Sequence, residues 1–244
     1  MKNLITVFLF IFCAISFGQK SKVWDEIDSL LRFNQYEIAE GRLDSFSKTD
    51  ESKVSINLLL EQFYRFKLIN DFSTDKYVNT IKKLESKLTT SKYPERALFE
   101  SFLAQVYENY WERNQRLIIG RATNLKNSTF EKWSSVEFKQ VIDSLYESSI
   151  SEEGVLTKIS VSNYSDFLDD TTFLDVTPTL YELLAERALK YYQRSYKVSS
   201  GFILNDSSNY APRDVFVHKN ITTSDSSNYG YKSVVLLQKL IKKH

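Results

Sequence analysis

Bulky apolar residues recur at steps of three or four along most of the chain, the spacing that places side chains on one face of an α-helix. In the clearest window Leu98, Phe102, Val106 and Tyr110 follow one another at steps of four. An all-β chain would need many tight turns, yet the 244 residues contain only 6 glycines and 3 prolines. The sequence therefore predicts an all-α fold.

The first windows predict a pair of short helices joined around Phe33-Asn34, a helical hairpin. The apolar stripes that define the expected helices are Trp24, Ile27, Leu30 and Leu31; Tyr36, Ala39, Leu43 and Phe46; Ile56, Leu59, Leu60, Phe63 and Phe66; Tyr77, Ile81, Leu84 and Leu88; Phe138, Ile142 and Leu145; Leu180, Leu184, Ala188 and Tyr192; and Val234, Leu237, Leu240 and Ile241. No sustained period of about 34 residues is present. We therefore expect an irregular array of helical hairpins with tetratricopeptide-like packing but no regular repeat.

Local signals place several helix ends. A long helix is predicted from near Pro94, carrying Leu117 and ending before Gly120, with a polar connector over residues 120–133 after it. Ser134 and Glu137 have the spacing of a capping box. A central helix is predicted to start at 177–179, where Pro178 would lie in the first turn and Glu182 near the positive helix end.

The remaining segments have weaker periodicity. Short helical turns are predicted over 151–169, and a polar, irregular connection over 199–229. Within that connection Val215-Phe216-Val217 predicts a short strand. The final segment, 233–244, has helical spacing and an apolar stripe that needs a covering neighbour, either the preceding helices or a further part of a longer protein.

The N-terminus has the pattern of a secretory signal. Lys2 precedes a continuous apolar run over 4–15, and Ser16-Phe17-Gly18 offers small residues for cleavage before Gln19. The alternatives are a retained anchor, although the run is shorter than the ~20 residues of a bilayer span, and a lipid-modified Cys13, although Phe12 is a poor match to that pattern. We expect an exported protein of the periplasm or cell envelope, contacting membrane only through an uncleaved signal.

Four regions are predicted: a signal peptide over 1–18, N-terminal helical hairpins over 19–90, a central helical region over 91–198, and an irregular connection with a terminal helix over 199–244. Cleavage of the signal would remove Cys13, the one cysteine of the chain. Disulfides, thiolate nucleophiles and cysteine-ligated zinc are then excluded from the mature protein.

Candidate catalytic residues are few. His218 and His244 lie far apart in the sequence and outside any metal-ligand spacing. The acidic pairs 152–153 and 169–170 are better explained as solvated loop residues than as an acid and base. The sequence has no glycine-rich phosphate loop and no nucleophile elbow. We expect no enzyme, no catalytic, cofactor or metal site, no cofactor and no small-molecule substrate, and the sequence leaves any binding residues unknown.

Nucleic acid is not an expected partner. The 32 basic and 31 acidic residues give a formal net charge of +1, so the chain has no strongly basic field. Arg187, Lys190, Arg194 and Lys197 alternate with Tyr191, Tyr192 and Tyr196, but on a helix these separate into a basic side and an aromatic core side. Asn127, Asn163, Asn205 and Asn220 begin short glycosylation-type motifs, which matter only in a host with that pathway.

Three stretches resemble the helical N-terminal region of large bacterial alpha-2-macroglobulin-family proteins. They are Leu98 to Arg121, followed by Trp133; Pro178 to Leu189; and Leu236 to His244. The stretch from Pro178 to Leu189 is the most similar to the family's sequence pattern. The family pattern has Arg-Thr where this chain has Arg121-Ala122-Thr123. Family members entrap proteases, and this chain would match only about the first tenth of one. The β-sandwich domains and the Cys-Gly-Glu-Gln thioester motif of the family are absent from this sequence. The resemblance therefore assigns no functional residue to this chain.

The resemblance implies a non-catalytic helical leader or scaffold region, part of a longer envelope protein. Its partners would be downstream domains of the same protein or another envelope protein. The alternative is a free-standing exported helical scaffold that binds peptides or envelope proteins. The high aromatic content of 14% fits either role, because large aromatic side chains close helix–helix contacts and are enriched at interfaces.

Overall fold

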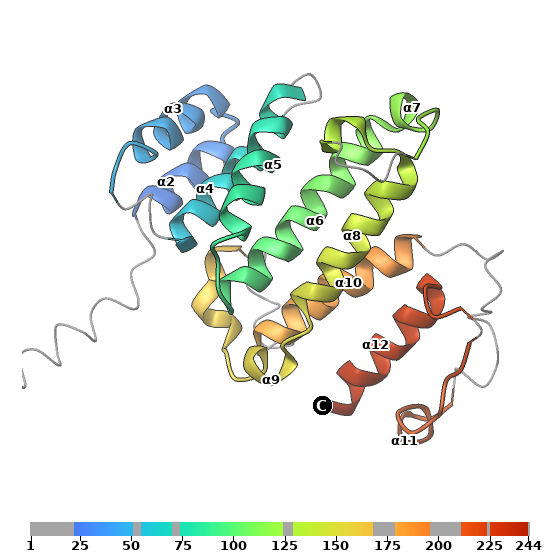
Figure 1. Ribbon diagram of the computed structural model, residues 1–244. Coiled ribbons are helices and arrows are strands. Elements are labelled where there is room, and N and C mark those ends of the chain that lie inside the picture. The colour runs from blue at the N-terminus through green and yellow to red at the C-terminus, as the bar shows by residue number, and fades with distance from the viewer. Residues whose placement is uncertain are drawn as a thin grey trace, which may run out of the picture. The chain divides into compact units, whose positions relative to one another are not determined.

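A computed structural model describes residues 22–50, 55–69, 74–123, 129–167, 179–195, 211–223 and 225–243 (Figure 1). Across these ranges the regular structure is helical, with one isolated bridge between Ser160 and Thr179 as the only β feature. The predicted all-α fold is confirmed. The predicted signal segment with Cys13, Lys197, His244 and the acidic pair at 169–170 lie outside the described residues.

The described residues fall into two compact units, and the division lies within one helix, between Thr80 and Ile81. The first unit contains α2 (Lys22–Arg32), α3 (Tyr36–Phe46), α4 (Ser55–Lys67) and the start of α5 (Thr74–Leu88). The second contains the rest of α5 and the helices from α6 (Glu95–Arg113) onward, except for residues 166–167, which belong to the first unit. The predicted region boundaries at 90 and 198 stay predictions.

The predicted first hairpin is confirmed. The chain reverses after α2 through Asn34, whose φ of 56° is in the left-handed region that asparagine tolerates better than most residues. Trp24 of α2 lies between Phe46 of α3 and Tyr64 of α4, with ring centroids 4.7 and 5.4 Å away. Tyr36 was predicted in the buried stripe but is 52% exposed, because its hydroxyl turns back to donate to the Asn34 side chain at 2.7 Å.

A polar contact joins α3 to α4 within the same unit. Arg65 donates to Glu61 at 2.8 Å and to Asp44 at 2.9 Å, and Glu61 also accepts from the Ser47 hydroxyl at 2.7 Å. The Glu61 side chain is only 5% exposed, so the guanidinium supplies the opposite charge that a buried carboxylate requires.

The core of the second unit forms around α6, which packs along α8 (Ser135–Ser149) (Figure 1). Twelve of its nineteen residues are buried, so neighbours cover most of its circumference. Helix α10 (Leu180–Ser195) packs against both α6 and α8, and α12 (Tyr229–Lys243) packs along α10. Helix α12 thus folds back onto a preceding helix, but its predicted apolar stripe is only partly covered: Val234 is buried, Leu237 is exposed, and Leu236 is buried in addition.

The predicted long helix is broken near its end. Helix α6 stops at Arg113, and a separate short helix, α7 (Gln115–Ile118), follows after Asn114. The Asn114 backbone departs from helical geometry, with φ of −100° and ψ of 12°, and this ends α6. As a result Leu117, predicted on the buried stripe, is 71% exposed and Ile118 is buried instead.

The connector predicted over 120–133 contains a short 3₁₀ helix, η3 (Phe130–Lys132), in its described part. Phe130 is buried there against Tyr107 and Tyr110, with centroids 5.8 and 5.3 Å away. The connector is therefore partly anchored to the core by an aromatic side chain that the polar composition concealed.

The two helix starts that the sequence singled out have different outcomes. The capping box before α8 is confirmed: the Ser134 amide donates to Glu137 at 2.7 Å, and the Glu137 amide donates to the Ser134 hydroxyl at 3.3 Å. Helix α10 begins at Leu180, later than predicted. Thr179 and Glu182 form the equivalent pair there, with the Thr179 amide donating to Glu182 at 2.9 Å. Thr177 and Pro178 lie outside the described residues.

The remaining elements are short. The helical turns predicted over 151–169 are present as α9 (Glu153–Leu156) and η4 (Val161–Phe167). The strand predicted at 215–217 is wrong: α11 (Arg213–Phe216) occupies this position, directly after Pro212. Only Phe216 of that apolar triplet is buried, so the triplet reflects one anchoring side chain. Helix α12 starts four residues earlier than predicted because the Asn228 side chain accepts from the Gly230 amide at 2.8 Å.

Candidate functional site

The titratable residues singled out from the sequence do not converge on a reactive centre. His218 is exposed in the segment after α11, and Glu153 forms an ion pair with Lys243 at 2.9 Å. Within the described ranges no group of three or more His, Cys, Asp or Glu side chains has an arrangement that could hold a metal ion.

The basic and aromatic residues of α10 separate as expected. Tyr191 and Tyr192 are buried, while Arg187 reaches α6 and donates to Ser101 at 2.8 Å and to Gln105 at 2.7 Å. Lys190 pairs with Glu186 at 2.7 Å on the same helix. This part of the basic series is therefore engaged in contacts within the chain.

A partly buried network surrounds Asp143 of α8. The carboxylate accepts from Tyr191 at 2.6 Å, from Tyr229 at 3.1 Å and from Lys232 at 3.4 Å. The ammonium of Lys232 also pairs with Glu147 at 2.7 Å and lies near the faces of Tyr192 and Tyr229. Burial raises the pKa of each of these tyrosines, so none is prepared to act as a phenolate. The network joins α8, α10 and α12 and serves packing.

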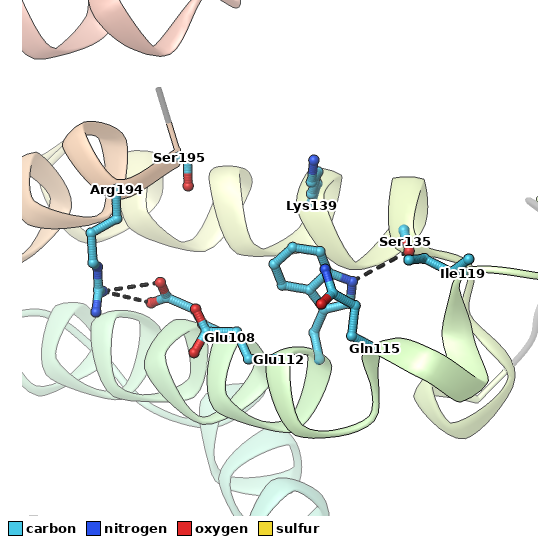
Figure 2. Close-up of a pocket in the computed structure, with 9 residues that line it drawn as sticks. Glu108, Glu112, Gln115, Ile119, Ser135, Lys139, Arg194 and Ser195 are labelled. Carbon is cyan, nitrogen blue, oxygen red and sulfur yellow. Dashed lines mark hydrogen bonds and ion pairs between the residues drawn. The ribbon is translucent and has the colours of Figure 1, made fainter. Parts of the chain in front are cut away.

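A groove of about 580 Å³ lies between α6, α8 and the end of α10 (Figure 2). We call it the α6–α8 groove. Its wall on α6 and α7 consists of Glu108, Trp111, Glu112, Gln115 and Ile119, and the facing side chains are Ser135 and Lys139 of α8 with Arg194 and Ser195 of α10. Successive residues on the α6–α7 wall are three or four positions apart except at the Trp111-Glu112 pair, so they share one helical face.

Trp111 provides the main apolar surface of the groove. Its indole nitrogen lies 3.4 Å from the Ser135 hydroxyl, which fixes the ring between the two helices. Lys139 places its ammonium 5.5 Å from the ring centroid, within the range of a cation–π contact. The ring is only partly buried, so it retains apolar surface that faces the groove.

The charges at the α10 end of the groove are unequally solvated. Arg194 donates to the Glu108 carboxylate at 3.0 Å (Figure 2), yet the Glu108 side chain is 5% exposed and that of Arg194 is 62% exposed. Burial raises the pKa of Glu108, and the negative charge of Glu112 raises it further, while Arg194 opposes the shift. Burial has the larger effect on this pKa, because the water around the exposed guanidinium weakens its attraction for the carboxylate.

Glu112 itself is exposed and, within the described part of the chain, has no ion-pair partner. It follows Glu108 by one turn of α6, as the labelled side chains in Figure 2 show. The groove thus combines a fixed indole ring, a like-charged pair of carboxylates and two cations that already have partners. It has the features of a recognition surface.

Three exposed apolar side chains lie close together in the sequence at the turn between α2 and α3 in the first unit. Phe33, Tyr36 and Ile38 are 73%, 52% and 57% exposed within six residues of sequence. Apolar side chains gathered on a surface mark interaction sites more often than scattered ones do.

Sequence reasoning missed the α6–α8 groove. The segment around Trp111 was singled out only for its family resemblance, although Glu108, Trp111, Glu112 and Gln115 share a helical face that mixes charge with one aromatic. A helical face of this kind can indicate an interaction site, but the groove also depends on α8 and α10, which are distant in sequence.

None of the described helices is both long and apolar enough to cross a membrane. No protein-family model, curated protein or solved structure matches the chain.

Proposed function

We propose that this chain is a non-catalytic helical interaction module that acts outside the cytoplasm, and that the α6–α8 groove is where it receives a segment of a partner polypeptide. The observation that carries the proposal is the groove itself, with Trp111 held in place by Ser135 and still partly open. Export rests on the signal pattern of residues 1–18.

The groove has suitable dimensions and chemistry for this role. Its volume of about 580 Å³ lies within the ~300–1,000 Å³ of typical ligand sites. Tryptophan is among the residues that contribute most to binding when an interface covers it. Covering a large apolar side chain contributes roughly 1.5–3 kcal/mol, so Trp111 and Ile119 together supply a useful part of the binding free energy.

The resemblance to the helical N-terminal region of alpha-2-macroglobulin-family proteins suggests where the partner is found. The module would pack against later domains of the same protein or against another envelope protein. A free-standing scaffold is the second candidate, and it is favoured by the packing of α12 along α10 together with the burial of Val234 and Leu236 of α12 within the chain.

Site-specific crosslinking tests the proposal. A photoreactive phenylalanine analogue at Gln115, which lines the groove, is compared with the same analogue at Arg116, the next residue, which is exposed and does not line it. We expect a discrete crosslinked product with an exported polypeptide from position 115 and none from position 116. Equal products from both positions, or none from position 115, would contradict the groove as the docking site.

A further inference from the structure

The charges that line the α6–α8 groove are not equally satisfied. Arg194 is paired with Glu108 at 3.0 Å, and Lys139 lies over the Trp111 ring at 5.5 Å. Glu112 is the exception, since no cation pairs with it among the described residues. The groove therefore presents one uncompensated carboxylate beside its apolar surface.

The position of Glu112 adds to this imbalance. It lies four residues after Glu108 on the same helix, the spacing at which like charges repel. Burial is the main cause of the raised pKa of the Glu108 carboxyl, and the negative charge of Glu112 acts in the same direction. A cation placed beside Glu112 would relieve both the repulsion and the missing pairing.

We propose that the α6–α8 groove recognises a polypeptide segment in which a lysine or arginine lies close to a large apolar side chain, the cation pairing with Glu112 and the apolar group covering Trp111 and Ile119. This inference rests on the proposed function of the groove and adds the chemistry of its partner. An arginine suits the site best, because its planar guanidinium can pair with both oxygens of the exposed Glu112 carboxylate.

An acidic segment fits less well. Its carboxylate would approach Glu112 and Glu108, and the two cations of the groove are already engaged with Trp111 and Glu108. A segment with a basic residue at position i and an apolar residue at position i+2 can reach Glu112 and Trp111 together, because side chains at i and i+2 of an extended segment point to the same side.

The test uses three matched peptides, acetyl-Gly-Xaa-Ala-Phe-Gly-amide with Arg, Gln or Glu as Xaa, titrated into the purified chain as the cell processes it. The readout is the indole N–H signal of Trp111 in a ¹⁵N–¹H NMR spectrum, assigned by its loss in Trp111→Phe. Because the peptides share the Phe, their differences isolate the charge.

We expect the Arg peptide to bind about three- to fivefold more tightly than the Gln peptide, the gain typical of one exposed ion pair. The Glu peptide should bind more weakly than both. Glu112→Gln should abolish the preference for Arg over Gln. Glu152→Gln removes an exposed carboxylate whose side chain caps no helix and should leave the preference intact.

The outcomes separate this inference from the proposed function. Equal binding of all three peptides at Trp111, tightest binding of the Glu peptide, or a preference that survives Glu112→Gln would overturn the basic partner but leave a polypeptide-binding groove. No movement of the Trp111 signal would overturn the inference, and the crosslinking at position 115 would then decide the function. A Trp111 signal that shifts with protein concentration alone would assign the groove to a second copy of the chain, which also overturns the proposal.

Discussion

The hydroxyl of Tyr191 on α10 donates to the carboxylate of Asp143 on α8 at 2.6 Å. The same carboxylate accepts from Tyr229 and Lys232 of α12, so one acceptor joins three helices. The Asp143 and Lys232 side chains are 21% and 16% exposed, so their charges are only partly hydrated and depend on each other. A buried polar network of this kind stabilises the native arrangement only while all of its members are satisfied.

Removal of the shared acceptor tests the network. We expect Asp143→Ala to lower the free energy of unfolding by about 2–4 kcal/mol, because it leaves two tyrosine hydroxyls and part of the Lys232 charge without their acceptor. The measurement is urea unfolding followed by circular dichroism. Gln140→Ala, at an exposed position of the same helix, should change stability by less than about 0.5 kcal/mol. Similar losses in both variants would contradict a special role for Asp143.

The tyrosines also predict instability in alkali. Burial raises the pKa of Tyr229 and of Tyr181 to about 12 in the folded chain, above the ordinary value of 10.0. The unfolded chain thus loses these protons at lower pH than the folded chain, so stability should fall as pH rises from 10 towards 12. Tyrosinate absorbance near 295 nm and helical circular dichroism should therefore change together for the buried tyrosines.

Phenylalanine substitution provides the control for that experiment. Tyr181→Phe removes one of the titrating groups, so the alkaline decline in stability should become shallower. The matched control is the same substitution at the exposed Tyr36. Ionisation of all tyrosines near pH 10, with the helices intact, would show that they are hydrated in the fold.

Two glutamates should give stability profiles of opposite sign in acid. Burial raises the pKa of Glu108 above its ordinary value of 4.5, so its contribution to stability is present below pH 4.5 and is lost as pH rises through the raised pKa. The Lys243 ammonium lowers the pKa of Glu153, so that contribution is present above pH 4.5 and is lost as pH falls through the lowered pKa.

Charge-removing variants separate these effects. As pH rises from about 3 to about 7, the parent chain should lose stability relative to Glu108→Gln. Over the lower part of that range, the parent chain should gain stability relative to Glu153→Gln as pH rises. The same sign of slope for both variants would contradict the assigned causes of the pKa shifts.

Gln62 of α4 offers a stabilising substitution. Gln62 is 1% exposed, and neither its side-chain nitrogen nor its side-chain oxygen has a hydrogen-bond partner among the described residues. Gln62→Met keeps the length of the side chain and removes the unsatisfied amide, so we expect the free energy of unfolding to rise by about 1–2 kcal/mol. The same substitution at the exposed Gln193 should give no such gain. A loss of stability in Gln62→Met would show that the amide is hydrogen-bonded in solution.

The sequence predicts the features that depend on neighbouring residues. The capping box at Ser134 and Glu137, the hairpin at Asn34 and the helical class of the fold all follow from spacings of a few positions. The break after Arg113 was missed because Asn114 is an acceptable helix residue, and only its backbone conformation, with φ of −100° and ψ of 12°, shows that it ends α6. The predicted strand at 215–217 failed because three adjacent apolar residues do not reveal which of them has a neighbour.

The candidate site was beyond local reasoning for a related physical reason. Trp111 lines a groove because Ser135, twenty-four residues later, holds its indole, and Arg194 lines one end of that groove from a third helix. A sequence pattern can mark the face of α6 as mixed in charge and aromaticity. It cannot show which helices leave that face partly open, since this depends on how they pack.

The turn at Asn34 supplies the last test. Its φ of 56° suits asparagine or glycine and strains a residue with an ordinary Cβ, so Asn34→Ala should lower the free energy of unfolding by about 1 kcal/mol. Asn34→Gly relieves the backbone but loses the side-chain bond to the Tyr36 hydroxyl, which is exposed, so its net effect should be within about 0.5 kcal/mol. Gln35→Ala, at the next residue with a φ of −88°, should change stability little. Thermal unfolding monitored by circular dichroism ranks the three variants, and an alanine at position 34 that is tolerated as well as one at position 35 would contradict a left-handed turn.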